Sequence, residues 1–116
     1  EMVAIHERMS PTGVRHVFDD FKRKKAVGKT ALDNCFQCTK TAGSYKMVLE
    51  GDGRRIAVKA GSRQFPFFQV FTPPHRESVA LEPMSCNVDA FNNGQGLVVL
   101  QPEQEWKAKM EVRLEA

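Results

Sequence analysis

The last ten residues before the carboxyl terminus alternate strictly between apolar and charged side chains. The apolar positions are Trp106, Ala108, Met110, Val112 and Leu114, and the charged positions are Lys107, Lys109, Glu111, Arg113 and Glu115. Successive side chains of a β-strand point to opposite faces, so this period gathers the apolar ones on one face. A helix would spread the charges around its circumference. The pattern predicts a strand with one face on a core and the other in water.

Similar alternation flanks the turn sequence Gly51-Asp52-Gly53, which predicts a hairpin of strands at 45–50 and 56–60. Further strand signals separated by proline, glycine or asparagine lie at 2–8, 65–72 and 78–83, and a buried apolar run lies at 97–100. About seven short strands predict an all-β fold, an antiparallel β-sandwich. With no linker or repeat in view, residues 1–116 are expected to form a single domain.

One segment departs from the strand pattern. Val14, Val17, Phe18 and Phe21 have helical spacing, and Asp19-Asp20 precede the basic run Lys22–Lys25. That charge order suits a helix dipole. The two alternatives for residues 14–30 are a short helix and a loop with one helical turn, inserted between strands.

Composition excludes several classes of function. The formal net charge of +3 is too small to predict a nucleic-acid partner, because phosphate binding needs a concentrated basic face. No apolar run is long enough to cross a bilayer, so no membrane association is predicted. The first ten residues lack the apolar stretch of a signal peptide. We therefore expect a cytoplasmic location.

The cysteines and histidines do not form a recognisable metal or redox motif. Cys35 and Cys38 form a CxxC pair, but zinc would need a second pair and Cys86 is the only cysteine left. A redox CxxC would begin a helix after a strand, which residues 32–34 do not suggest. Reduced, unreactive cysteines are the prediction. His6, His16 and His75 show no metal spacing, and no metal is predicted.

Two polar residues stand within predicted strands. Gln69 is a lone amide in the row formed by Phe65, Phe67 and Phe71. Glu82 is the only acid in a stretch, 79–87, that is otherwise apolar or uncharged. A buried carboxylate is costly unless it is partnered, which makes Glu82 a candidate acid or base. The alternative is an exposed glutamate at a strand end.

Asp33 and Asn34 are a second polar pair in apolar company, and from the residues alone an Asx turn or cap explains them best. The chain nevertheless interleaves aromatic rings with amides and acids. Sugar rings stack their CH faces on aromatic rings, and their hydroxyls bond to amides and carboxylates. The residues are thus compatible with a carbohydrate site.

Several motifs resemble, in order, those of the aldose 1-epimerase (galactose mutarotase) family. They are Pro-Thr-Gly at 11–13, Leu-Asp-Asn-Cys-Phe at 32–36, the aromatic segment 65–74, Leu-Glu-Pro-Met-Ser-Cys at 81–86 and Asp-Ala-Phe-Asn-Asn-Gly at 89–94. The resemblance covers nearly the whole chain from Pro11 onward and corresponds to the carboxyl-terminal half of the family's large β-sandwich.

The resemblance implies a hexose substrate and the interconversion of its α and β anomers, with no metal or organic cofactor. It implies that Glu82 is the catalytic general base and that Asp33 and Gln69 bind the sugar. The family's catalytic histidine lies in the earlier half, and none of the three histidines here matches its motif. A complementary amino-terminal half or self-association as a homodimer is therefore expected, because a lone half would leave sheet edges unpaired. The alternatives are a non-catalytic carbohydrate-binding module and a truncated, self-associating fragment.

Overall fold

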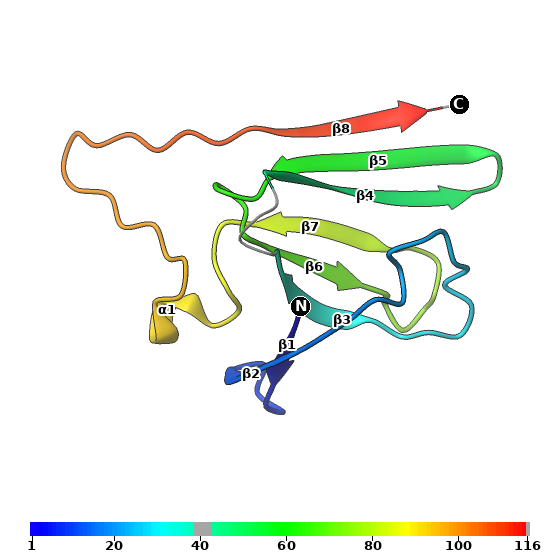
Figure 1. The fold of residues 1–116 in the computed structure, drawn as a ribbon, viewed down its shortest axis with the longest axis horizontal. Helices are drawn as coiled ribbons and strands as arrows, with labels where there is room; N and C mark the ends of the chain where they lie inside the picture. The colour runs from blue at the N-terminus through cyan, green and yellow to red at the C-terminus, as the bar shows by residue number, and fades with distance from the viewer. Residues whose placement is uncertain (39–42, 116) are drawn as a thin grey trace.

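The computed structural model describes residues 1–38 and 43–115, which contain eight strands in two antiparallel sheets (Figure 1). The five-stranded sheet has the order β2 (Pro11–His16), β1 (Met2–Ile5), β3 (Asp33–Gln37), β6 (Phe67–Phe71) and β7 (Ala80–Met84). The three-stranded sheet has the order β4 (Ser44–Gly51), β5 (Arg54–Gly61) and β8 (Met110–Glu115). A single helical turn, α1 (Ala90–Asn93), follows β7. The predicted all-β, antiparallel sandwich class is confirmed. No helix within the described ranges is long and apolar enough to cross a membrane.

The predicted hairpin is present as β4 and β5. Asp52 and Gly53 turn the chain with φ of 49° and 71°, the left-handed conformations that a tight hairpin requires. Met47 pairs with Val58, which in turn pairs with Val112 of β8. The apolar positions of the three strands therefore share one face of this sheet, and the charged positions share the other.

The terminal strand is shorter than its alternating pattern. The prediction began it at Trp106, whereas β8 begins at Met110, opposite Ala60. The chain turns after Gly61, where the Phe65 amide donates to the Gly61 carbonyl oxygen. In this register Gly61, the last residue of β5, lies opposite Lys109, and the residues before Lys109 have no β5 residue with which to pair. Alternation alone does not make a strand without a neighbouring strand.

The prediction of a buried run at Leu97–Leu100 is wrong. This segment is irregular, and the side chains of Val98, Val99 and Leu100 are exposed. No described strand lies alongside to bury them. Consecutive apolar residues indicate burial only where another element covers both faces of the chain.

One face of the five-stranded sheet carries a small core. Val3, Cys35 and Phe67 are buried together, and Val88 of the loop after β7 packs against them. Gly96 brings this loop close: a Cβ there would lie 3.0 Å from the Ser85 carbonyl oxygen. The loop therefore covers one end of this face, next to the positions that the following section describes.

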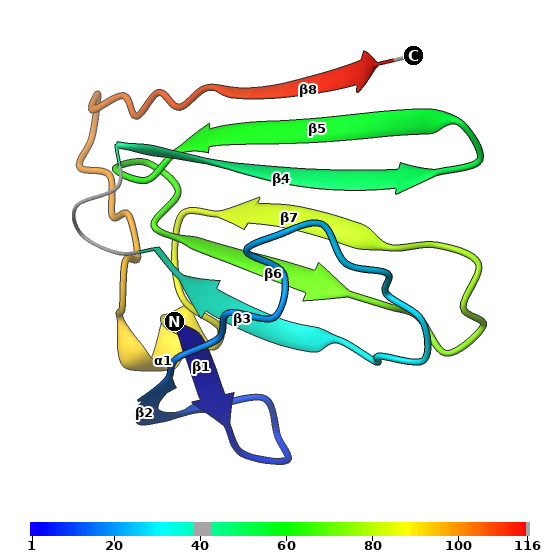
Figure 2. The ribbon, with the colours of Figure 1, turned by 45° about the vertical axis from the view of Figure 1, so that its right-hand side comes forward.

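The opposite face is aromatic. Phe36 stacks on Phe68 with ring centroids 5.1 Å apart, and Phe18 packs on Phe36 at 4.9 Å. Tyr45 of β4 lies 5.2 Å from Phe68, which joins the two sheets. Figures 1 and 2 both show β4 running beside β7 at this junction. A cavity of about 760 Å³ lies there, lined by aromatic and aliphatic side chains together with charged residues that include Lys22–Lys25.

Residues 14–30 contain no helix. Val14–His16 belong to β2, and the remainder is an irregular loop with turns at Asp19–Lys22 and Val27–Thr30. The helically spaced aromatic residues pack without forming a helix. Phe18 and Phe21 pack against each other, and Phe18 packs on Phe36 of β3. Of the two alternatives, the structure has the loop, and it begins at Val17.

Candidate functional site

The strand register brings the three predicted site residues to one face of the five-stranded sheet. Gln69 of β6 lies opposite Cys35 of β3 on one side and opposite Glu82 of β7 on the other. Asp33 precedes Cys35 by two residues and so points to the same face. Three adjacent strands therefore each contribute one polar side chain to this face. We call Asp33, Gln69 and Glu82 the polar row.

Asp33 and Gln69 are directly bonded. The Gln69 amide nitrogen, Nε2, donates to Asp33 Oδ1 at 2.7 Å. A carboxylate can only accept, so the bond fixes which end of the amide faces Asp33. Gln69 is buried, and its Oε1 has no partner among the described residues. The site thus holds an unpaired acceptor next to an exposed carboxylate, which suits a ligand rich in hydroxyl groups.

A pair of contacts at the strand ends sets the position of Asp33. The Leu32 amide donates to Thr72 Oγ1 at 2.7 Å, and the Thr72 amide donates to the Leu32 carbonyl oxygen at 2.7 Å. Both residues are buried. This closes the end of the β3–β6 ladder one residue beyond Asp33. From the residues alone, an Asx turn or cap explained Asp33 best. In the structure the Asp33 carboxylate instead accepts a hydrogen bond from Gln69.

Glu82 lies on β7, the edge strand, and is exposed. Its carboxylate makes no hydrogen bond or ion pair within the described ranges. Pro83 follows it, and an edge strand tolerates a residue that cannot donate to the ladder. The exposure of Glu82 agrees with the interpretation as a glutamate at a strand end. Its position opposite Gln69 agrees with the interpretation as a candidate acid or base. The geometry leaves a carboxylate that can take a proton from a ligand lying on the polar row.

Sequence reasoning missed a polar network beside the row. The buried Asn87 accepts from the Cys35 thiol at 3.5 Å and donates to Gln95 Oε1 at 2.7 Å. Arg15 bonds the same Gln95 oxygen at 3.3 Å and Gln37 Oε1 at 2.8 Å. The network ties β2 and β3 to the loop after β7. No motif in the sequence links its members, and only the register of distant strands brings them together.

The cysteines are free thiols in the described chain. Burial raises the pKa of Cys35 to about 11, and burial also raises the pKa of Cys38. A protonated thiol is a poor nucleophile and metal ligand, which agrees with the prediction of unreactive cysteines. No group of three or more His, Cys, Asp or Glu side chains in the described part could hold a metal ion.

The histidines lie away from any described contact with Glu82. His75, in the loop between β6 and β7, accepts from the Glu77 amide through Nδ1 at 3.0 Å. His6 belongs to the turn between β1 and β2, and His16 ends β2 opposite Met2. Within residues 1–38 and 43–115, no histidine is bonded to the polar row.

Comparison with known proteins places this chain in a family. The model of the aldose 1-epimerase family matches residues 2–113. A protein of Escherichia coli (strain K12), the uncharacterized protein YihR, is 31% identical over 107 residues, which cover 87% of this chain. The chain spans 33% of the length of that relative. No solved structure matches the chain. The chain belongs to the aldose 1-epimerase family.

Proposed function

We propose that this chain carries the general base and part of the sugar-binding surface of a mutarotase, an enzyme that interconverts the α and β anomers of a hexose. The observation that supports this most is the polar row. Asp33 and Gln69 are bonded to each other, an unpaired Gln69 oxygen lies beside them, and Glu82 is next in register. Family membership supports the same reaction class.

In the proposed reaction, the Glu82 carboxylate removes the proton from the anomeric hydroxyl of the cyclic sugar. The bond between the anomeric carbon and the ring oxygen breaks, and the ring oxygen takes its electron pair together with a proton from a general acid. The open-chain aldehyde rotates about its bond to the next carbon. Closure by the reverse steps gives the other anomer and returns both protons. Each positioned acid or base typically contributes about 10² to 10⁴-fold.

Asp33 and Gln69 orient the sugar in this proposal. An ionised carboxylate accepts from sugar hydroxyls, and Asp33 keeps acceptor capacity beyond its bond to Gln69. The Gln69 oxygen accepts one further hydroxyl. A ligand that fills this acceptor recovers the cost of a buried unpaired polar atom, about 1–3 kcal/mol. The row therefore favours a hydroxylated ligand over an apolar one.

The general acid is proposed to be a histidine of a complementary amino-terminal half. The matched relative is about three times longer than the stretch aligned to it, which leaves ample length for such a residue in related proteins. We therefore propose that catalysis needs a complementary amino-terminal half, and that this chain contributes the base.

Substitution of the base tests the proposal. Polarimetry on freshly dissolved α-glucose or α-galactose should show that Glu82→Gln lowers kcat by at least about a hundredfold in the complete protein. The control is Glu77→Gln, an exposed glutamate in the loop before β7, which should leave kcat unchanged. Equal turnover in the Glu82→Gln variant and the unsubstituted protein would exclude Glu82 as the base.

A second candidate is a module that binds a sugar without converting it. The observation that favours it is that no described histidine is bonded to Glu82 or to the rest of the polar row. Calorimetry of the chain with hexoses separates the two. Sugar affinity with no acceleration of anomer exchange, even when an amino-terminal half is supplied, would establish the binding module and reject the enzyme.

A further inference from the structure

β8 is an exposed edge strand with an apolar face. It pairs with β5 on one side, and no described strand pairs with its other side (Figure 1). Met110, Val112 and Leu114 are 53%, 62% and 73% exposed. Unpaired edge groups beside apolar side chains are a template for pairing with another chain, and natural proteins usually cover or disrupt them.

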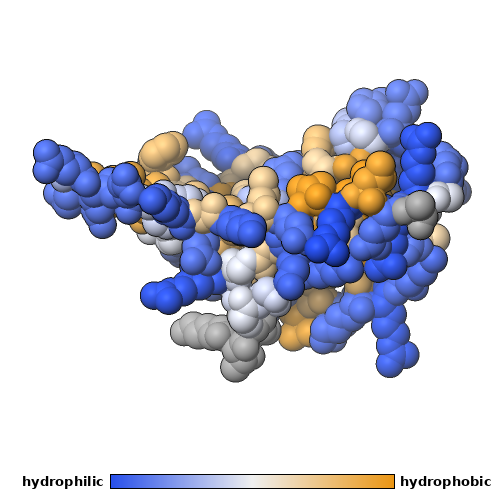
Figure 3. Space-filling view, turned by 90° about the horizontal axis from the view of Figure 1, so that it is seen from above, coloured by the Kyte–Doolittle hydropathy of each residue, from blue (hydrophilic) through white to orange (hydrophobic). Residues whose placement is uncertain are grey.

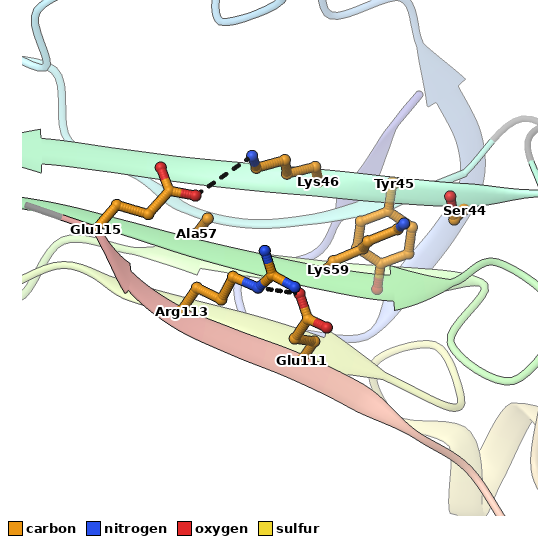
Figure 4. A pocket seen from close by; sticks show the side chains of 8 residues that line it. All are labelled: Ser44, Tyr45, Lys46, Ala57, Lys59, Glu111, Arg113 and Glu115. Carbon is orange, nitrogen blue, oxygen red and sulfur yellow. Dashed lines mark ion pairs between the residues drawn. The ribbon is translucent and has the colours of Figure 1, made fainter.

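The charges of β8 lie on the opposite face from these apolar side chains. Figure 4 shows Glu111, Arg113 and Glu115 on one side of the sheet, with Arg113 bonded to Glu111 at 2.7 Å. Lys46 of β4 lies 3.9 Å from Glu115 on the same face. Figure 3, which looks onto the side where β8 lies, shows hydrophobic residues gathered among hydrophilic ones. The edge thus presents an apolar row and a charged row to any incoming strand.

We propose that a second copy of this chain pairs with β8 in antiparallel register centred on Val112. In this register Val112 lies opposite the partner's Val112, and Met110 lies opposite the partner's Leu114. Glu111 faces the partner's Arg113, and Lys109 faces the partner's Glu115. The symmetry of a two-fold pair repeats each contact, so the edge gains four opposite-charge pairs and an unbroken apolar row.

Neighbouring registers lack this match. Centring the pair on Arg113 would place Glu111 opposite the partner's Glu115. Centring it on Glu111 would place Lys109 opposite the partner's Arg113. Both put like charges directly opposite each other, which destabilises a ladder. A shift by a single residue would place apolar against charged side chains on both faces. Among the registers centred on Glu111, Val112 and Arg113, only the one centred on Val112 pairs opposite charges throughout. The charge sequence of β8 is self-complementary in that register, which favours a second copy of the chain as the occupant.

The resulting dimer has a six-stranded sheet with the order β4-β5-β8-β8-β5-β4. On one face of this sheet the apolar side chains of β4, β5 and β8 from both copies form a continuous surface. On the other face the charged side chains of the same strands do so. The inference stands apart from the sugar chemistry, because the polar row lies on the other sheet.

Charge reversal tests the register. Sedimentation of the full chain over a range of protein concentrations should show a monomer–dimer equilibrium. Arg113→Glu would place like charges opposite the partner's Glu111 twice, and it should weaken the dimer by about tenfold or more. Arg113 lies opposite Ala57 within the chain, so this variant removes no charged cross-strand partner, and the only intrachain ion pair of the described residues that it removes is the exposed one with Glu111 of the same strand. Glu111 lies opposite Lys59 of β5 within the chain, so the rescue also reverses that partner. The triple variant Lys59→Glu, Glu111→Arg, Arg113→Glu should restore the dimer, because every cross-strand charge pair, within the chain and between copies, is again of opposite sign.

Lys107→Glu is the matched control. It makes the same change in charge, but Lys107 precedes β8 and lies outside the positions paired in the proposed register, so dimerisation should be unaffected. Circular dichroism of each variant at low concentration checks that the monomer is folded. A chain that stays monomeric throughout, a dimer that is indifferent to Arg113→Glu, or a folded triple variant that fails to recover the dimer would each overturn the proposal.

Discussion

At the scale of single residues, Gln69 shows how a functional position differs from a core position on the same strand. Its neighbours on this face of β6 are Phe67 and Phe71, and Gln69 is buried like a core residue. The amide instead uses one end for Asp33 and leaves its oxygen unpaired. Such an atom costs about 1–3 kcal/mol unless a ligand satisfies it.

This cost leads to a prediction for Gln69→Leu. Removing the unpaired oxygen should leave the free energy of unfolding unchanged or higher, because the exposed Asp33 carboxylate can bond to water instead. Sugar affinity should fall by at least about tenfold, since one hydrogen bond to a charged or polar group is worth about 1 kcal/mol or more. Urea unfolding and calorimetry measure the two effects. A large loss of stability at constant affinity would make Gln69 a core residue.

The buried Cys35 thiol gives a prediction for alkaline pH. Its pKa is about 11 in the folded chain and 9.0 without the fold, because burial disfavours the thiolate. The folded state therefore holds the proton more tightly, and this contribution is fully present below pH 9 and is lost between pH 9 and 11. Two pKa units correspond to about 2–3 kcal/mol. The stability difference between the wild type and Cys35→Ala should narrow over that interval.

Cys86→Ala is the reference for this measurement, because Cys86 is only partly buried. Urea midpoints at several pH values between 8 and 11 suffice, because the two variants share every other titrating group apart from these cysteines. A gap between wild type and Cys35→Ala that stays constant across the interval would show that the thiol ionises as readily in the folded state as in the unfolded one.

At the scale of elements, alternation identified strands well where a neighbouring strand was also alternating. The β4–β5 hairpin was predicted to within one or two residues because its turn and both its strands carry local signals. β3 was not predicted as a strand, because Asp33 and Asn34 have turn preferences that the ladder to β6 overrides. The run at 97–100 failed for the opposite reason, since its apolar signal has no described partner element.

The loop after β7 provides a prediction at this scale. Gly96 has φ of 75°, and an added Cβ would lie 3.0 Å from the Ser85 carbonyl oxygen and 3.1 Å from Cys86 Cα. Gly94 has a similar φ of 69° with open space around it. Gly94→Ala should therefore cost about 1 kcal/mol for the left-handed backbone alone, and Gly96→Ala about 1–3 kcal/mol more. Equal urea midpoints for the two variants would mean that the loop moves away freely.

At the scale of the whole molecule, Tyr45 is one residue that joins the two sheets. Its hydroxyl donates to the Phe67 carbonyl oxygen at 3.2 Å, and its ring packs on Phe68. The apolar side chains of β8 and of Val98, Val99 and Leu100 are exposed. The sequence could place Gln69 and Glu82 on strands, but not Asp33, and the face that the three residues share depends on pairings between strands that are distant in the chain.

Two substitutions of Tyr45 should separate the contribution of its hydroxyl hydrogen bond from that of its ring packing. Tyr45→Phe removes only the hydroxyl and should lower the free energy of unfolding by about 0.5–1.5 kcal/mol. Tyr45→Ala also removes the ring and should cost about 3–5 kcal/mol. Hydrogen exchange should show faster exchange in β4 and β5 than in β6 for the alanine variant. Uniform acceleration in both sheets would mean that they unfold as one unit whether or not Tyr45 joins them.

The polar row also has a consequence for how such a site tolerates sequence change. Hydrogen-bonded strands lie about 4.8 Å apart, so main-chain pairing sets the spacing of Asp33, Gln69 and Glu82 along the sheet. Substitutions around the row can accumulate without altering that spacing. A one-residue deletion in β7 would instead turn Glu82 toward the aromatic face while leaving every neighbouring residue type in place. Insertions and deletions in β3, β6 and β7, rather than point substitutions nearby, are therefore the changes that distant relatives and redesigned variants must avoid.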